Sequence, residues 1–291
     1  MKIALFTGGL TEERPVSIAS ATNVNKLLDF ADTETFVMPE DLEKFVATHK
    51  SFDFAIPIIH GKGGEDGVIQ GLFESLSIPY LFSGVQASSI AIDKKRTKQI
   101  AKALGYTVTK ESSVENSSFP LFAKPRFGGS SVASGLCKSQ ADLDNLKKLC
   151  SDPFILEQPL KGREFTVGVI EQNGKTIALP VIEIITPENS FFDFEHKYDP
   201  NNLAGEICPA QIPIELNSAL QAEALAIHTE IGARHISRSD FIVTNTNEIF
   251  FLEINTIPGM TNTSLIPKMV AAAGLNLRDL LKQWANEALS N

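Results

Sequence analysis

The first third of the chain alternates short apolar runs with segments of helical spacing. This pattern predicts strands at 2–7 and 53–59 and helices at 18–28 and 68–77. A glycine-rich stretch follows each strand, GGL after the first and HGKGGEDG after the second. Strand, glycine-rich loop and helix in series favour a parallel α/β sheet, and the ligands of such sheets gather at the carboxyl ends of the strands.

The middle of the chain changes to shorter elements. A basic helix, DKKRTKQIAKALG, ends at Gly105, and a short strand at 121–124 opens onto the stretch PRFGGSSVASG. A further helix is expected at 141–150. Two apolar runs then meet at Asn173-Gly174, a dipeptide typical of tight hairpin turns. This region therefore predicts helices mixed with antiparallel strands.

The last third combines a long loop with two helices. Residues 191–208 show no regular apolar spacing, which predicts a long loop of the kind that closes over binding sites. Helices are expected at 216–231 and 277–289. The fold class expected for the whole chain is mixed α/β, with an N-terminal parallel sheet followed by α+β units.

The segment SDFIVTNTNEIFFLEIN predicts two strands joined by a polar turn. A turn centred between 246 and 247 sets Asp240 directly opposite Glu253, and Asn255 shares their face because strand side chains repeat every two residues. Opposed like charges destabilise a sheet unless they are neutralised. Oxygen ligands without His or Cys suit Mg²⁺, so a magnesium site is predicted. The apolar residues of the second strand are expected on the opposite face: Phe250, Leu252 and Ile254.

Small residues follow the strand at 121–124 in KPRFGGSSVASG. Backbone N–H groups of such a loop can turn toward an anion, and Lys124 at the strand end adds a positive charge. Together with Lys94, Lys197 and the predicted magnesium site, this loop indicates binding of nucleotide phosphates.

The stretch NTIPGMTNTSL follows the predicted metal strand directly. Gly259 can expose its backbone amide there, and Ser264 supplies a hydroxyl. Arg238 lies two residues before Asp240 and shares its face if the strand extends that far. A guanidinium and a backbone N–H beside a bound metal are what a developing oxyanion at a carboxyl carbon requires.

Composition narrows the class of protein. The 291 residues carry a formal net charge of −9, so a nucleic-acid partner held by phosphate contacts is not expected. The apolar runs are shorter than the roughly 18 residues that cross a bilayer, and three widely spaced cysteines fit no disulfide framework. We therefore expect a cytoplasmic protein of about two or more domains, without a membrane partner.

Together these motifs resemble those of D-alanine–D-alanine ligases of the ATP-grasp superfamily. The matching stretches run over nearly the whole chain in the family's order: HGKGGEDGVIQG, PYLFSGVQASSIAIDKKRTK, KPRFGGSSV, FILEQPLKGREFTV, FFDFEHKY, RSDF and FLEINTIPGMTNTSL. The resemblance implies the ATP-grasp fold with a Rossmann-like domain at 1–86, a small central α+β domain at 87–160 and an α+β domain at 161–291 that carries the metal site. It also implies a homodimer.

The resemblance further implies roles for single residues. ATP would be held by Lys94, Lys124, Ser131, Glu157, Leu160, Glu164, Phe192 and Lys197. Two Mg²⁺ ions, or Mn²⁺, would be held by Asp240, Glu253 and Asn255. The catalytic groups would be Arg238 and Gly259 at the oxyanion, with Ser130 and Tyr198 bracing the loop over the first amino acid. The amino-acid substrates would contact Glu13, His60, Ser264 and Leu265.

The activity implied by the resemblance is the ATP-dependent joining of two D-alanines through an acyl phosphate, for peptidoglycan precursor synthesis. The family normally has Glu immediately before the Val-Ser pair of its N-terminal motif, whereas this chain reads TEERPVS with Pro15 at that place. Two alternatives therefore stay open: a ligase for another amino-acid pair, and an ATP-binding regulator without ligase activity. Gln158 at the adenine hinge and Gly128 in the glycine-rich loop also depart from the family.

Overall fold

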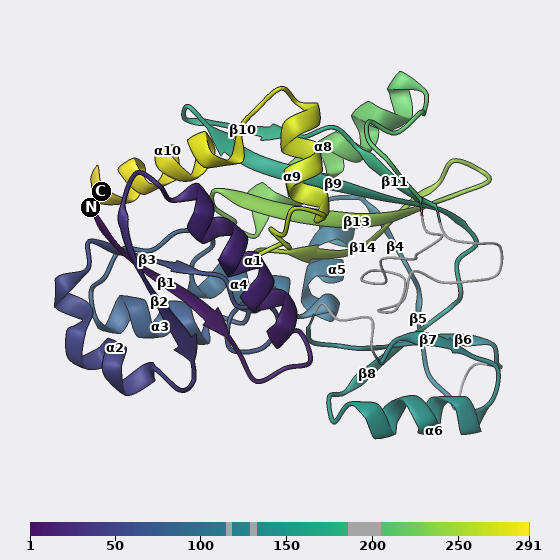
Figure 1. The fold of residues 1–291 in the computed structure, drawn as a ribbon. Coiled ribbons are helices and arrows are strands. Elements are labelled where there is room, and N and C mark those ends of the chain that lie inside the picture. The colour runs from purple at the N-terminus through teal and green to yellow at the C-terminus, as the bar shows by residue number, and fades with distance from the viewer. Residues whose placement is uncertain (115–117, 129–132, 186–204, 291) are drawn as a thin grey trace.

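The computed structural model describes residues 1–114, 118–128, 133–185 and 205–290. Within these ranges the strands form three sheets, of three, seven and four strands, with helices packed around them (Figure 1). The mixed α/β class expected from the sequence is confirmed. No helix in the described ranges is both long and apolar enough to cross a membrane.

The N-terminal unit is built on a parallel sheet, as its strand–loop–helix pattern predicted. The strand order is β2-β1-β3, and Phe6 of β1 pairs with Phe36 of β2 and Pro57 of β3. The elements of this unit are β1 (Lys2–Gly8), α1 (Arg14–Leu27), β2 (Asp32–Met38), α2 (Leu42–Thr48), the 3₁₀ helix η1 (His49–Ser51), β3 (Phe54–Pro57) and α3 (Val68–Ser75).

The sequence pattern missed β2 and began α1 too late. β2 is an edge strand, and the first half of its sequence DTETFVM is polar and partly exposed, so it forms no apolar run. α1 begins at Arg14, before the predicted start at 18, and has Pro15 in its first turn. Proline is favoured there because the first N–H groups of a helix have no partner within it.

The central unit is a four-stranded antiparallel sheet in the order β5-β8-β6-β7. Its elements are β5 (Glu111–Ser112), β6 (Leu121–Pro125), β7 (Gly135–Cys137), α6 (Gln140–Leu149) and β8 (Phe154–Glu157). α6 is the helix predicted at 141–150. The described core of this unit is small, with three fully buried members: Ala123, Cys137 and Leu143.

The largest sheet follows the path β12-β11-β9-β13-β14-β4, with β10 paired to β9. Its strands are β4 (Thr107–Val108), β9 (Gly162–Gln172), β10 (Lys175–Ala178), β11 (Ile182–Ile185), β12 (Gly205–Ile207), β13 (Ile236–Thr244) and β14 (Ile249–Asn255). The helices of this region are α4 (Val85–Ala91), α5 (Lys94–Ala103), α8 (Ile214–Glu230), α9 (Leu265–Ala272) and α10 (Leu277–Ser290).

Three local predictions are confirmed in this region. Asn173 and Gly174 form the turn between β9 and β10, both at positive φ. The helices predicted at 216–231 and 277–289 are α8 and α10. All three rest on short-range patterns, since a turn dipeptide or a helical repeat is read within one segment.

One hydrophobic core joins the N-terminal unit to the C-terminal part of the chain. Leu5 and Ile56 of the parallel sheet belong to the same buried cluster as Ile236 of β13 and Trp284 of α10. α10 packs against α1 and β3 (Figure 1). The two regions therefore share buried apolar surface. The domain boundaries at 86/87 and 160/161 stay a prediction.

Candidate active site

Two carboxylates face each other across a hairpin of the large sheet, as predicted. Asp240 of β13 pairs directly with Glu253 of β14. Nearer the turn, Val243 pairs with Ile249, which centres the turn half a position earlier than predicted. A β-bulge between these two regions adds Leu252 on one strand and shifts the register by one residue. The predicted pairing is therefore correct because the bulge offsets the error in the turn.

The bulge also changes which side chains of β14 face the core. Phe251 and Ile254 are buried in one cluster, and Ile249 packs against it. Phe250 and Leu252 are only partly buried. A bulge inserts one residue and reverses the in–out alternation beyond it. The prediction that Phe250, Leu252 and Ile254 share one face is therefore wrong.

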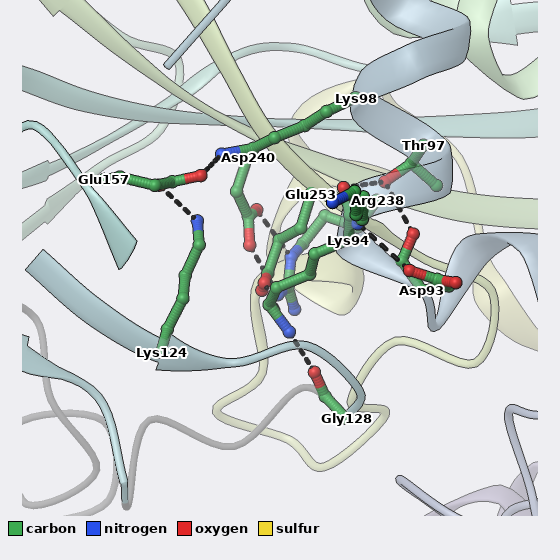
Figure 2. Close-up of polar contacts among 11 residues, drawn as sticks. Asp93, Lys94, Thr97, Lys98, Lys124, Gly128, Glu157, Arg238, Asp240 and Glu253 are labelled. Carbon is green, nitrogen blue, oxygen red and sulfur yellow. Dashed lines mark hydrogen bonds and ion pairs between the residues drawn. The ribbon is translucent and has the colours of Figure 1, made fainter. Parts of the chain in front are cut away.

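Protein cations hold both carboxylates in this structure (Figure 2). The Arg238 guanidinium donates two hydrogen bonds to Asp240, at 3.0 and 2.9 Å. The Lys94 ammonium lies 3.1 Å from the Glu253 carboxylate. The Thr166 hydroxyl also donates to Asp240, at 2.6 Å. The opposed negative charges are thus neutralised by two residues for which sequence reasoning predicted other roles.

The oxygen donors of this hairpin fit a divalent cation. Asp240 and Glu253 lie on neighbouring strands, and Asn255 follows Glu253 on the same strand. The buried amide nitrogen of Asn255 has no hydrogen-bond partner among the described residues, which is unfavourable. Exchanging the amide oxygen and nitrogen would present an oxygen that a cation could bind. The described residues contain no group of three His, Cys, Asp or Glu side chains arranged for a metal, so the set needs the Asn255 amide.

A cavity of about 100 Å³ borders this hairpin. Nine of the residues assigned by the resemblance line it together: Glu13, His60, Glu164, Arg238, Asp240, Asn255, Gly259, Ser264 and Leu265. A smaller neighbouring pocket is lined by Lys94 and Glu253 and shares Glu65 and Asn255 with the first. The structure therefore brings predicted residues from the N-terminal unit and the large sheet to one place.

Glu13 and Pro15 have different surroundings. Glu13 lines the cavity, and its Oε2 lies close enough to Gly61 that a Cβ there would approach it to 2.8 Å. Pro15 is exposed in the first turn of α1 and is not one of the residues lining the cavity. Pro15 is therefore not part of the cavity lining, and Glu13 supplies the acidic group from this segment.

Two buried titratable groups border the cavity. Burial, and then the nearby Glu13, raise the pKa of Glu65 to about 8, so this carboxyl is largely protonated at neutral pH. Burial lowers the pKa of His60 to about 4, so its ring is neutral. Sequence reasoning missed Glu65, because the pattern of a glycine-rich loop does not indicate which side chain turns inward.

A second buried group of charges surrounds Glu157 of β8 (Figure 2). The Lys124 ammonium lies 3.1 Å from its carboxylate, and Lys98 donates to the same carboxylate and to Thr109. Burial alone would raise the pKa of Glu157, but the two lysines outweigh it and lower the pKa to about 2. Sequence reasoning missed Lys98. The sequence feature that could have identified Lys98 is its helical spacing with the other buried residues of α5: Lys94, Thr97 and Ala101.

The other predicted site residues divide into two groups. Leu160 is partly buried in the connection between β8 and β9. Gly128 has a φ of +90°, a conformation that favours glycine, and its carbonyl accepts a hydrogen bond from Lys94. Five predicted residues and most of the loop predicted at 191–208 lie outside the described residues: Ser130, Ser131, Phe192, Lys197 and Tyr198.

Comparison with known proteins decides the family. Residues 37–83 match the family described as D-ala D-ala ligase N-terminus, and residues 85–285 match D-ala D-ala ligase C-terminus. The D-alanine–D-alanine ligase of Desulfotalea psychrophila is 36% identical over 300 residues, which cover 97% of this chain and 92% of that protein. This chain belongs to the D-alanine–D-alanine ligase family.

Solved structures similar to this member of the family show the same fold. D-alanyl-alanine synthetase A from Vibrio cholerae aligns with a TM-score of 0.85 and 26% identity, over 100% of this chain and 99% of that one. The D-alanine–D-alanine ligase from Bacillus anthracis, complexed with ATP, aligns with a TM-score of 0.81 and 28% identity, over 100% and 98%. The ATP-grasp fold and the family resemblance expected from the sequence are confirmed.

Proposed function

We propose that this chain joins two D-alanine molecules to D-alanyl-D-alanine, converting ATP to ADP and phosphate, for peptidoglycan synthesis. The observation that carries the proposal is the composition of the cavity. An acidic group (Glu13), a guanidinium (Arg238) and a hydroxyl (Ser264) from distant segments meet there beside a pair of strand carboxylates. Membership of the D-alanine–D-alanine ligase family supports the same reaction.

ATP is proposed to lie between the central unit and the large sheet. The charges of Lys94 and Lys124 suit its phosphates, and both ammonium groups are nearly buried beside a carboxylate. The hinge residues Glu157 and Leu160 would meet the adenine through backbone groups, and Glu164 would meet the ribose. Ser131, Phe192 and Lys197 complete the proposed nucleotide site.

Two Mg²⁺ ions are proposed at Asp240, Glu253 and Asn255. Bound magnesium would neutralise phosphate charge and polarise the phosphoryl oxygens. Arg238 and Lys94 now neutralise these carboxylates. With the cation in place, both side chains would be released toward the reacting groups.

The proposed reaction has two steps. The carboxylate of the first D-alanine attacks the γ-phosphorus, and the bond to ADP breaks, which gives an acyl phosphate. The amine of the second D-alanine attacks the acyl carbon, and phosphate leaves. Arg238 and the Gly259 amide stabilise the oxyanion of the tetrahedral intermediate, which forms when the amine attacks and ends when phosphate leaves. Glu13 holds the first ammonium, while Ser264 and Leu265 receive the second amino acid.

Further features belong to the same proposal. Ser130 and Tyr198 would brace the loop over the first amino acid, and the chain would act as a cytoplasmic homodimer without nucleic-acid or membrane partners. The alternatives of another amino-acid pair or an inactive regulator were prompted by Pro15. That residue is exposed and does not itself line the cavity, whereas Glu13 does, so we keep D-alanine as the proposed substrate.

The test is release of ADP from ATP and Mg²⁺ with D-alanine, with L-alanine, and with no amino acid, while mass spectrometry follows the dipeptide. Turnover that depends on D-alanine and yields D-alanyl-D-alanine is expected. ATP binding without any dipeptide would instead support the inactive regulator. ADP release with a different amino acid would support a different ligase.

A further inference from the structure

The turn that carries Gly259 is held by side chains of the N-terminal unit. The Asn23 amide of α1 donates to the Met260 carbonyl at 2.7 Å, and the Met260 N–H donates to the Ser20 hydroxyl at 3.2 Å. On the other side of Gly259, a side chain of the N-terminal unit also binds the backbone of the turn. The Ile257 N–H donates to Glu65 Oε1 at 3.2 Å. Backbone groups on both sides of Gly259 are thus bonded across the junction between the two regions.

His60 connects the two sides of this turn, and the partners of its two ring nitrogens determine which atom donates in each hydrogen bond. Its Nδ1 lies 2.9 Å from the Ile257 carbonyl, and its Nε2 lies 3.1 Å from the Ser20 hydroxyl. A carbonyl only accepts, so Nδ1 carries the proton. The neutral ring then accepts at Nε2 from the Ser20 hydroxyl, which itself accepts the Met260 N–H. Each donor in this chain has one acceptor.

The residues of this network are buried, except Asn23, which is partly buried. Ser20 is fully buried, His60 and Glu65 are 5% and 6% exposed, and Ile257 and Met260 are 1% and 0% exposed. Buried hydrogen bonds with fixed direction are costly to break, since each would leave an unsatisfied polar group. The position of the turn therefore depends on the side chains that α1 and the 60–65 segment present to it.

We propose that Ser20, Asn23 and His60 are positioning residues that hold the Gly259 amide where the oxyanion forms. The inference rests on the proposed function, and it changes the role predicted for His60. Both ring nitrogens of His60 already bind protein groups, so its contribution is to place the turn and not to bind an amino acid through its ring. The N-terminal unit then acts on the second chemical step through the backbone of the C-terminal part.

A misplaced oxyanion donor has a specific signature in this two-step reaction. The first step, which releases ADP, does not use the Gly259 amide, whereas attack of the second amine does. Slowing only the second step exposes the acyl phosphate to water, which cleaves it to D-alanine and phosphate. The number of ADP molecules released per dipeptide then rises above one. A general loss of folded enzyme lowers both products together and leaves this number unchanged.

The decisive variants are Asn23→Asp and Ser20→Ala in the full-length chain. Asn23→Asp keeps the side-chain size but sets an acceptor oxygen against the Met260 carbonyl. Removing one oxyanion donor costs about 10²–10³ in kcat, so displacing it should lower dipeptide formation by about tenfold or more. ADP released per dipeptide should rise, while KM for ATP stays within about twofold because the nucleotide contacts are untouched.

A control and an independent variant keep the experiment sharp. Asn25→Asp makes the same change at an exposed position of the same helix and should behave as the unchanged protein. Ser20→Ala changes a different bond of the same turn, so it gives an independent answer even if Asn23→Asp folds poorly. One ADP per dipeptide in both Asn23→Asp and Ser20→Ala would overturn the inference. No dipeptide from the unchanged chain would instead overturn the proposed function.

Discussion

At the scale of single residues, the site is defined by which positive groups hold its carboxylates. Arg238 forms an ion pair with Asp240, and Lys94 forms one with Glu253. The two carboxylates lie directly opposite each other on adjacent strands. Two like charges directly opposite each other on neighbouring strands require compensation. On the proposed function, magnesium would replace Arg238 and Lys94 at the same two carboxylates when the nucleotide binds.

Asp240→Asn and Glu253→Gln should each lower kcat for dipeptide formation about 10³-fold or more. Each variant removes a charged metal ligand that is worth several kcal/mol to the transition state. The measurement is kcat over a Mg²⁺ titration up to saturation. Glu248→Gln, at an exposed position of the same hairpin, is the matched control and should keep full activity. Near-normal turnover in both site variants would contradict the metal site.

The first-substrate site gives a second prediction at this scale, on Glu13 and Pro15. Glu13→Gln should lower kcat/KM for D-alanine by about 10- to 100-fold, the cost of losing a charge-assisted hydrogen bond of about 1.5–3 kcal/mol. Pro15→Glu restores the family motif but lies on the surface, so it should change kcat/KM by less than about twofold. A large gain in Pro15→Glu would show that position 15 reaches the substrate after all.

At the scale of elements, α5 differs from an ordinary basic surface helix. Its buried face carries Lys94 and Lys98, whose charges are directed to Glu253 and to Glu157. The Asp93 side chain caps its N-terminus by accepting from two backbone N–H groups. The helix therefore connects β14 of the large sheet with β8 of the central unit.

Lys98→Met should raise KM for ATP by about tenfold and leave kcat within about threefold, since Lys98 acts on the nucleotide only through Glu157 and Lys124. Initial rates at varied ATP measure both constants. Lys102→Met changes an exposed lysine one turn further along the same helix and serves as the control. Equal KM values for the two variants would show that the Lys98 charge does not reach the nucleotide.

α8 gives a prediction on pH. Glu223 is 4% exposed, one of its carboxyl oxygens has no partner in the described part of the chain, and burial raises its pKa from 4.5 to about 8. Because the folded state holds the proton more tightly, the stability from Glu223 is present below pH 4.5 and is lost as the pH rises toward 8, at up to about 1.4 kcal/mol per unit. Thermal unfolding of Glu223→Gln should therefore depend less on pH between 6 and 8.5.

Glu65 titrates in the same pH range in the unchanged chain and in Glu223→Gln. The difference between their plots of stability against pH therefore reports on Glu223 alone. The variant should gain stability relative to the unchanged chain as the pH rises. Parallel curves would mean that Glu223 is ionised in the folded protein.

At the scale of the whole molecule, buried apolar surface is distributed unequally. The N-terminal unit and the large sheet share one extensive core that includes the indole of Trp284. The central unit has its own small core around Leu143. Stability follows buried apolar area, so we expect the central unit to have the lowest opening free energy of the described parts.

Hydrogen exchange tests this difference. The amides of β6, β7 and α6 should exchange faster than those of β1, β9 and β13 in the nucleotide-free protein. Saturating ATP and Mg²⁺ should slow exchange in β6 and β8, because the hinge then has a ligand, by a free energy that grows with ligand concentration. Uniform protection across all three sheets would show a single cooperative unit instead.

Features encoded over short distances could be predicted from the amino-acid sequence alone. Strand alternation predicted the pairing of Asp240 with Glu253, although a bulge had to offset the error in the turn. The Asn173-Gly174 dipeptide marked a hairpin, and the order of motifs identified the family. Such features depend on one segment or on two neighbouring strands, where geometry repeats with a fixed period. The polar edge strand β2 escaped notice because its pairing, and not its apolar content, makes it a strand.

Which side chains line the cavity depends on the packing of distant segments. Glu13 lines the cavity and Pro15 does not. Lys98 forms an ion pair with Glu157, and the amide of Asn23 donates to the carbonyl of Met260, a residue 237 positions away. These contacts depend on how α1, α5 and the large sheet pack around a shared core. A local pattern carries no information on such packing, since the same helical spacing suits a solvated lysine and a buried one equally well.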